Sequence, residues 1–138
     1  MEAKPAHMMV LVDTTVWIDF FSAQPTSHVQ SLEDLINERE DICICGIILT
    51  EVLQGIRKDS EYRKTRDLFC DLIFLPMHYS VFLRAAEIYR KLRQKGITIR
   101  RSLDSIIASV AIDHNIPLLH NDKDFLQIKK HSDLKLFC

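Results

Sequence analysis

Four acidic residues each fall where a secondary-structure element is expected to begin or end, beside apolar sequence that disfavours an isolated charge. They are Asp13, Glu51, Asp104 and Asp122. Several carboxylates within a few ångströms cannot all ionise unless a cation lies among them, because like charges drive their pKa values apart. A site made only of carboxylate oxygens selects Mg²⁺ or Mn²⁺ and not zinc. Because such a cation activates water and neutralises phosphoryl charge, the set favours phosphodiester hydrolysis.

Each of these acids also has an ordinary structural explanation. Asp13 follows an apolar strand and could simply be the N-cap of the next helix. Glu51 and Asp104 lie in first helical turns, where a carboxylate complements the helix dipole, and Asp122 lies in a turn. Gly55, one turn after Glu51, is expected to clear space beside that carboxylate at a cost of ~1 kcal/mol of helix propensity. Together, however, the acids gather at the end of a parallel sheet where sites form.

The elements that would position the acids alternate between strands and helices. Strands are predicted at 8–12, 41–46 and 116–120, with a last edge strand at 134–137; helices are predicted at 16–21, 29–36, 47–56, 79–95 and 102–114. The polar, charge-mixed segment 57–67 is assigned no element, and 121–125 is assigned to a turn. Ser27 is expected to cap the second helix, and Gly96 to end the helix that begins at Tyr79. This alternation predicts an α/β fold with a mainly parallel sheet and helices on both faces.

The composition predicts one domain without a strong overall field. The chain has 138 residues, 47% of them hydrophobic, and a net charge of -1 from 18 basic and 19 acidic residues. That length can bury a proper core, and the near-neutral charge means that any polyanion must meet a local patch. Residues 9–138 are assigned to the domain, and residues 1–8 to a cloning remnant or a disordered lead.

The cysteines and the apolar runs favour a cytoplasmic location. Cys43, Cys45, Cys70 and Cys138 lack zinc-type spacing, and most of them lie in apolar sequence, where a free thiol acts as a small hydrophobe. A reducing compartment fits them best. No apolar run reaches the roughly 18 residues that would span a bilayer, and no signal-peptide pattern is present.

A local basic patch is available for a phosphate backbone. It lies at the end of the helix that begins at Tyr79 and just before Asp104, and a solvated helix face explains it equally well. Its members are Arg90, Lys91, Arg93, Lys95, Arg100 and Arg101.

The order of three sequence segments resembles PIN-domain ribonucleases, specifically the VapC-like toxins of type II toxin–antitoxin systems. The segments read LVDTTVWIDFF, then ILTEVLQGI, then SLDSIIASVAIDHNIPLLHNDKDF, and the resemblance covers residues 9–137. It implies a three-layer α/β/α PIN-like fold and a Mg²⁺- or Mn²⁺-dependent endoribonuclease. It further implies a homodimer that is inhibited by a co-expressed antitoxin, whose C-terminal segment wraps the toxin and can place a basic side chain in the acidic pocket.

The resemblance also assigns the site residues. Asp13, Glu51, Asp104 and Asp122 match the catalytic and metal-binding acids, and Thr14 matches a hydroxyl residue that assists the site. The sequence departs from many relatives at 120–121, where His and Asn stand in place of a Thr. Asp124 is therefore a second candidate for the last acid.

Two other functions are compatible with part of this pattern. A phosphatase of the haloacid dehalogenase type needs a second Asp two residues after the first, where this chain has Thr15. A non-catalytic RNA- or protein-binding module with a PIN-like fold is expected to have lost an acid, and none is missing. The histidines show no pairing that supports metal-free cleavage.

Overall fold

A parallel four-stranded sheet forms the centre of the computed structural model, which describes residues 8–137. The strands lie in the order β3-β2-β1-β4, and each neighbouring pair is parallel. The two middle strands carry almost only buried side chains, because helices cover both faces of the sheet. The bounds are Met9–Val12 for β1, Asp41–Cys45 for β2, Ile73–Leu75 for β3 and Leu118–Leu119 for β4.

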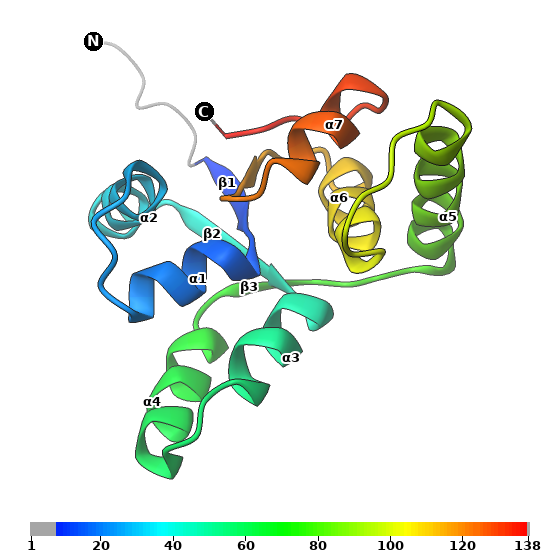
Figure 1. The fold of residues 1–138 in the computed structure, drawn as a ribbon. Helices are drawn as coiled ribbons and strands as arrows, with labels where there is room; N and C mark the ends of the chain where they lie inside the picture. Colours follow the sequence, from blue (N-terminus) through cyan, green and yellow to red (C-terminus); the bar gives the residue numbers. More distant parts are fainter. Residues whose placement is uncertain (1–7, 138) are drawn as a thin grey trace, which may run out of the picture.

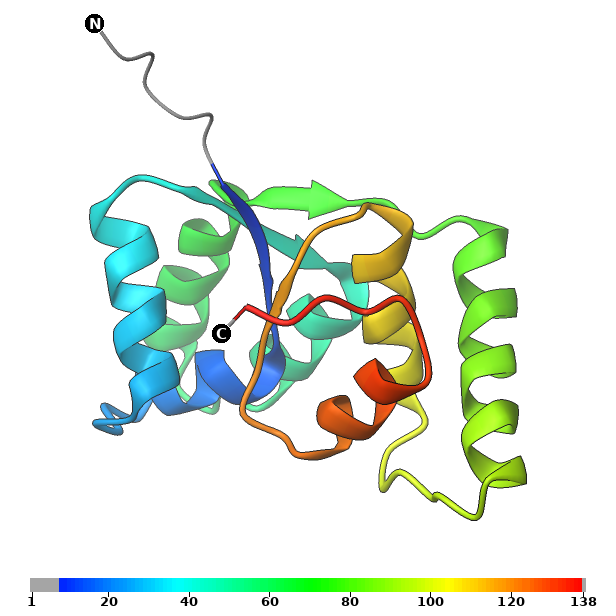
Figure 2. The ribbon, with the colours of Figure 1, turned by 90° about the horizontal axis from the view of Figure 1, so that it is seen from above.

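The helices form one layer on each side of the sheet. In Figure 1, α1 to α4 lie to the left of and below the strands and α5 to α7 to their right, and Figure 2 shows α2 and α5 at opposite ends of the molecule. The structure thus confirms the predicted three-layer α/β/α arrangement. The first layer comprises α1 (Thr14–Phe21), α2 (Ser27–Asn37), α3 (Gly46–Gln54) and α4 (Asp59–Cys70), and the second α5 (Tyr79–Gln94), α6 (Leu103–Asp113) and α7 (Asp124–Lys130).

Helix α6 lies deep in the second layer, between α5 and α7. Ile107, Ala108, Val110 and Ala111 are each at most 1% exposed. Small side chains at two of these positions let neighbouring backbone approach closely, so α6 is held on several sides. The first turn of this well-packed helix carries Asp104.

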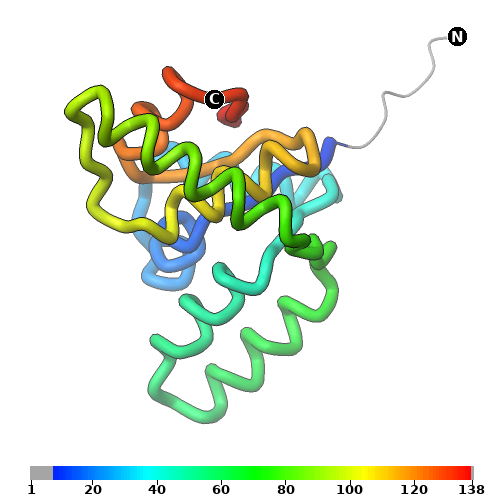
Figure 3. Tube along the Cα trace, turned by 90° about the vertical axis from the view of Figure 1, so that its right-hand side faces the viewer, coloured from blue at the N-terminus to red at the C-terminus, as the bar shows by residue number. Residues whose placement is uncertain are grey.

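Two helices and a strand lie where no element was predicted. Helix α4 buries only Thr65 and Phe69, so its sequence carries too little apolar periodicity to reveal it. In Figure 3, α3 and α4 run side by side away from the rest of the fold, which explains this polarity. Strand β3 was missed because it is short and half exposed, and the expected turn after β4 continues into the short helix α7.

Some predicted boundaries are wrong and others are confirmed. Thr26, and not Ser27, caps α2, because its Oγ1 accepts a hydrogen bond from Val29 N at 3.3 Å. The predicted edge strand at 134–137 is reduced to one parallel bridge between Leu118 and Leu136. Gly96 follows α5 with a φ of 76°, the left-handed conformation expected after a helix end.

The ends of the chain bear on two of the sequence predictions. Residues 1–7 of the predicted lead and Cys138 lie outside the described residues, whereas Met8 is described, and its carbonyl accepts from Asp41 N at 2.9 Å.

Cys43, Cys45 and Cys70 are free thiols. Between residues 8 and 137, no helix has the length and apolar character needed to span a membrane.

Candidate functional site

Asp13 lies at the carboxyl end of β1 and is also the N-cap of α1. Its Oδ2 accepts hydrogen bonds from Thr15 N at 3.2 Å and from Thr15 Oγ1 at 2.6 Å. Its Oδ1 is buried and has no hydrogen-bond partner among the described residues. Burial raises the pKa of Asp13 despite the bonds from Thr15. The capping role is therefore real, but it uses one oxygen and leaves the other free to bind a ligand.

Glu51 reaches the same edge from α3, which follows β2. Its Oε1 accepts from Thr14 Oγ1 at 2.8 Å, and its Oε2 forms a salt bridge with Arg101. These contacts hold a side chain that is only 16% exposed. The role predicted for Gly55 is wrong: a Cβ there would meet only backbone carbonyls at ordinary contact distance, so the glycine does not clear space for the carboxylate.

Asp104, in the first turn of α6, is also strongly affected by burial. Asp104 is 2% exposed, and its Oδ2 has no hydrogen-bond partner within residues 8–137. Burial raises its pKa from 3.8 to about 7, although the nearby Arg101 opposes the shift. The nearest charged partner of Oδ1 is Arg101 Nε at 3.9 Å. An ionised carboxylate is unfavourable in this position unless a further cation is present.

Asp122 and Asp124 come from the turn after β4 and from the start of α7. Asp122 Oδ1 accepts from Asp124 N at 3.0 Å and from Arg100 Nη2 at 2.7 Å. Asp124 Oδ2 accepts from Arg100 N at 3.0 Å. Asp122 N donates to Nδ1 of His120 at 3.1 Å, and burial lowers the pKa of that imidazole. These bonds fix the conformation of the turn.

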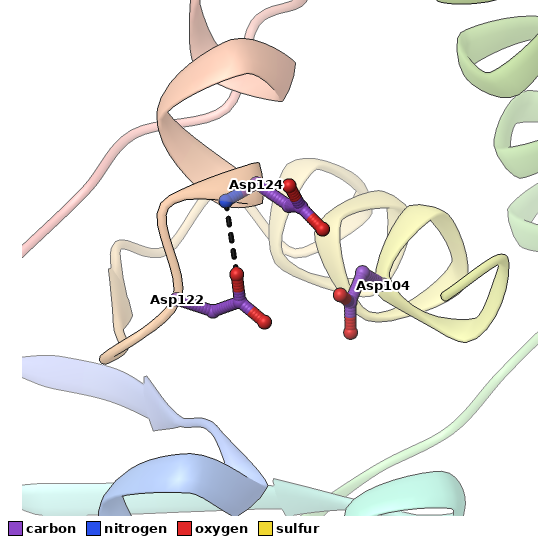
Figure 4. Close-up of side chains that lie close together, drawn as sticks. All are labelled: Asp104, Asp122 and Asp124. Carbon is purple, nitrogen blue, oxygen red and sulfur yellow. Dashed lines mark hydrogen bonds between the residues drawn. The ribbon is translucent and has the colours of Figure 1, made fainter. Parts of the chain in front are cut away.

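The structure brings three aspartates into one group. Asp104, Asp122 and Asp124 each offer an oxygen, and these oxygens all lie within 4.8 Å of one another. Figure 4 shows Asp104 on α6 facing the other two across a short gap. Asp124, the second candidate for the last acid, thus lies beside Asp122. Asp13 and Glu51 lie outside this group, but Asp13 raises the pKa of Asp104 and Glu51 raises that of Asp13.

The donor set fits a hard divalent cation. It consists of carboxylate oxygens, and two of them, Asp13 Oδ1 and Asp104 Oδ2, are buried without partners in the described part of the chain. Buried polar atoms are nearly always satisfied, so such a pair needs an explanation. A cation coordinated by both would satisfy them and offset the repulsion among the acids.

The residues of the predicted basic patch do not form one surface. Arg100 and Arg101 are paired with acids of the site. Arg90 and Arg93 line a cavity with Ser102, and Arg93 lies over the Tyr89 ring at 5.8 Å. Lys91 lines a different cavity beside Asp133. Arg90, Lys91, Arg93 and Lys95, on and just after α5, are exposed and remain the candidates for contact with RNA.

A hydrogen-bond network next to Asp13 was not predicted from the sequence. Asn121 N donates to Thr15 Oγ1 at 3.1 Å, and Asn121 Nδ2 donates to Asp19 Oδ2 at 3.0 Å. The same Asp19 oxygen lies 2.8 Å from His28 Nε2. The network joins the turn after β4 to α1, whose residues are about a hundred positions away, so no local pattern could have revealed it.

Comparisons with known proteins identify the family and the fold. The family model described as PIN domain matches residues 10–131. The chain is 32% identical over 129 residues to the VapC ribonuclease Mb1587 of Mycobacterium bovis, which covers 92% of this chain and 96% of that protein. The structure of VapBC2 from Rickettsia felis bound to a DNA fragment from their promoter superposes with a TM-score of 0.74 at 25% identity, covering 94% of this chain and 98% of that one. VapBC-5 of Mycobacterium tuberculosis, a member of the VapBC family of toxin-antitoxin systems, shares the fold with a TM-score of 0.69 at 20% identity, covering 94% and 97%.

Proposed function

The chain belongs to the PIN-domain family, among its VapC-like members, and on this premise we propose that it is a metal-dependent endoribonuclease that acts as the toxin of a toxin–antitoxin pair. The observation that carries the proposal is the pair of buried, unpartnered oxygens of Asp13 and Asp104. They point to a cation site, and the similarity to proteins named as VapC ribonucleases supports ribonuclease chemistry for it.

The proposed catalytic and metal-binding residues are Asp13, Glu51, Asp104 and Asp122. Asp13 and Asp104 would hold the ion through their free oxygens, and Thr14 would orient Glu51 through its hydroxyl hydrogen bond. Asp124 supports the site because its backbone N–H fixes the Asp122 carboxylate. A site of carboxylate oxygens favours Mg²⁺ or Mn²⁺.

The chain's own residues would supply positioning and charge. When bound, the cation lowers the pKa of a water and neutralises charge on the phosphoryl group. The hydrogen bonds to Glu51 and Asp122 hold their carboxylates in place before RNA arrives, which lowers the reorganisation needed during the reaction. Arg90, Lys91 and Arg93 on α5, with Lys95 at its C-cap, would contact the RNA backbone outside the site.

The partners follow from family membership. We propose that a cognate antitoxin inhibits the chain, that residues 9–138 form one PIN domain, and that two copies form a homodimer. The exposed side chains of Tyr79, Phe82 and Leu83 on α5 support a protein interface on that helix. A cytoplasmic location agrees with the free thiols of Cys43 and Cys45.

Cleavage of total RNA by the purified protein tests the proposal. Mg²⁺ should support cleavage, EDTA should stop it, and Asp13→Asn should abolish it while the far-UV circular dichroism is unchanged, because the substitution removes ligand charge and not core volume. Asp71→Asn, the same change at an exposed carboxylate away from the site, is the matched control and should cleave normally. Mapping the cut ends identifies the target. Retained cleavage by Asp13→Asn, in a preparation free of other ribonucleases, would contradict the proposal.

A further inference from the structure

We propose that Arg101 takes two positions: without metal it holds the acidic edge together, and when a divalent cation binds it leaves the carboxylates and contacts a phosphate of the RNA. The proposal rests on the function proposed above and adds a substrate-contacting residue to it. It also predicts that this residue competes with the metal for the same acids.

The contacts of Arg101 place its charge among the proposed ligands. Its Nη2 pairs with Glu51 Oε2, and its Nε lies 3.9 Å from Asp104 Oδ1. The guanidinium thus bridges acids from α3 and α6, two elements that carry different proposed ligands. A single positive charge in this position offsets part of the repulsion among the acids. It does not satisfy Asp13 Oδ1 or Asp104 Oδ2, which remain without partners in the described chain.

A divalent cation at those free oxygens would change the balance around Arg101. The ion would bring a larger positive charge close to the guanidinium and would draw on the same carboxylates. Two cations that share one set of acids repel each other. The attraction between the guanidinium and the carboxylates would therefore become weaker. The Arg101 side chain is 38% exposed, so it has solvent on one side and room to move.

A cavity beside Glu51 could hold the phosphate that the released Arg101 side chain would contact. A cavity of about 520 Å³ opens beside Glu51 and is lined by Thr50, Met77, Phe82 and Leu103 as well. Glu51 lines this cavity and is the residue that Arg101 contacts, so a phosphodiester bound along the cavity would lie beside the partner of Arg101. The planar guanidinium can donate two parallel hydrogen bonds to phosphate oxygens, which a lysine cannot reproduce.

The neighbouring Arg100 does not share these properties. Its backbone N–H donates to Asp124 at 3.0 Å and its side chain donates to Asp122 at 2.7 Å, so main chain and side chain both hold the turn. Moving this side chain would remove one of the two hydrogen bonds that Asp122 Oδ1 accepts. Arg100 is therefore a positioning residue. Arg101 differs, because its carbonyl accepts from Asp104 N at 3.1 Å while its side chain contacts Glu51 and Asp104, so that side chain can move without releasing the turn that holds Asp122.

Metal titration of the RNA-free protein tests the displacement. Isothermal titration calorimetry with MgCl₂ and with MnCl₂, at pH 8.5, above the pKa of about 7 of Asp104, compares wild type with Arg101→Gln and Arg101→Lys. Arg101→Gln should bind the metal about threefold to tenfold more tightly, because the competing charge is gone. Arg101→Lys should lie near wild type. Arg66→Gln, at an exposed arginine on α4, is the matched control and should not change the affinity.

Cleavage at saturating metal tests the contact with phosphate. Arg101→Gln should lose about tenfold to a hundredfold in kcat despite its tighter metal binding, and Arg101→Lys should recover only part of it. A residue with a purely structural role would not move the two measurements in opposite directions. Circular dichroism in EDTA checks that each variant is folded. If Arg101→Gln does not fold, the partial loss of kcat expected for Arg101→Lys still tests the contact with phosphate.

The outcomes separate this proposal from the proposed function. Unchanged or weaker metal binding by Arg101→Gln overturns the displacement, and an unchanged kcat at saturating metal overturns the phosphate contact. If the wild-type protein binds metal but cleaves no RNA, the ribonuclease function fails, while the calorimetry still decides whether Arg101 competes with the ion.

Discussion

The acidic edge has two sides that differ in how their charges are satisfied. The Arg100 side consists of Asp122, Asp124 and Arg100, and its acids accept hydrogen bonds from backbone amides and from the guanidinium. The Arg101 side consists of Asp13, Glu51, Asp104 and Arg101, and two of its buried oxygens have no partner among the described residues. The first side has its hydrogen bonds without a ligand, whereas the second keeps two buried oxygens unpaired in the described chain.

The difference indicates that the two sides have different tasks. Satisfied carboxylates fix the geometry of a turn, because each lost bond would leave a polar atom unpaired. Burial raises the pKa of a carboxyl group that has no partner, as at Asp104, and such a group gains most from a bound cation. The Arg100 side therefore positions the site, and the Arg101 side provides the oxygens that a cation would satisfy.

Asp104→Asn should have the largest effect, because it removes charge from the unsatisfied side. We expect RNA cleavage to fall by about a hundredfold or more and metal affinity to fall with it. Steady-state cleavage of a defined RNA and calorimetric titration with MnCl₂ measure the two effects. Normal metal affinity in this variant would show that the Arg101 side is not where the ion binds.

The stability of the metal-free protein gives a second readout of Asp104. Because its pKa is raised from 3.8 to about 7 in the folded chain, the native state binds more protons than the unfolded state between those values. The free energy of unfolding should therefore decrease as the pH rises from about 4 to about 7 and then level off. Urea unfolding in EDTA should show this decrease in wild type and a smaller one in Asp104→Asn. An equal decrease in both would assign it to other groups.

Asp124→Asn should have an intermediate effect. It removes one negative charge from the Arg100 side but keeps the size and shape of the side chain. The Arg100 N–H would lose a charged acceptor, and the turn that holds Asp122 would loosen. We expect cleavage to fall by about tenfold, chiefly in kcat, with metal affinity reduced less than in Asp104→Asn. A loss as large as that of Asp104→Asn would make Asp124 a principal ligand.

Arg100→Ala should act more weakly than either acid variant. The Arg100 backbone N–H would still donate to Asp124, so only the side-chain bonds to an exposed guanidinium are lost. We expect cleavage to fall by less than about tenfold, and metal affinity to stay unchanged or to rise slightly. Hydrogen exchange of the amides at 121–125 should speed up, and unchanged exchange would show that this side chain does not hold the turn.

The combined change Arg93→Ala and Lys95→Ala should have the smallest effect, because these residues lie outside both sides of the edge. RNA affinity should fall by a few-fold, and the salt slope should drop by about 1.4, the value for two phosphate contacts on a single strand. Fluorescence anisotropy in an Asp13→Asn background measures both without cleavage. The matched control is Lys64→Ala with Arg66→Ala on α4. Equal slopes in the two double variants would leave the α5 residues as a solvated surface.

Much of the fold followed from local pattern. The apolar runs before Asp13 and Gly46 predicted β1 and β2, and the spacing of the helix before Gly96 predicted α5, because burial against a sheet imposes a clear periodicity. Helix α4 buries so little that its sequence carries no such signal. Strand β3 and helix α7 were too short to show one.

The candidate site was only partly readable in the same way. An acid after an apolar strand, as at Asp13, is visible in the sequence because the position of a strand end is local information. The partner of Glu51 is not, since Arg101 lies 50 residues further along the chain. The two arginines before Asp104 were therefore assigned to an RNA-binding patch, whereas the fold pairs both with acids.

The sequence by itself determined which residue types stand at the sheet edge and in what order, because strand ends and helix starts are set by local propensity and burial. Only the tertiary structure decided how those acids divide: Asp122 and Asp124 are satisfied by Arg100, whereas Asp13 and Asp104 keep buried oxygens without partners among the described residues. The physical reason is that hydrogen bonding and desolvation depend on which distant side chains meet, and that is fixed only when the sheet and both helix layers pack.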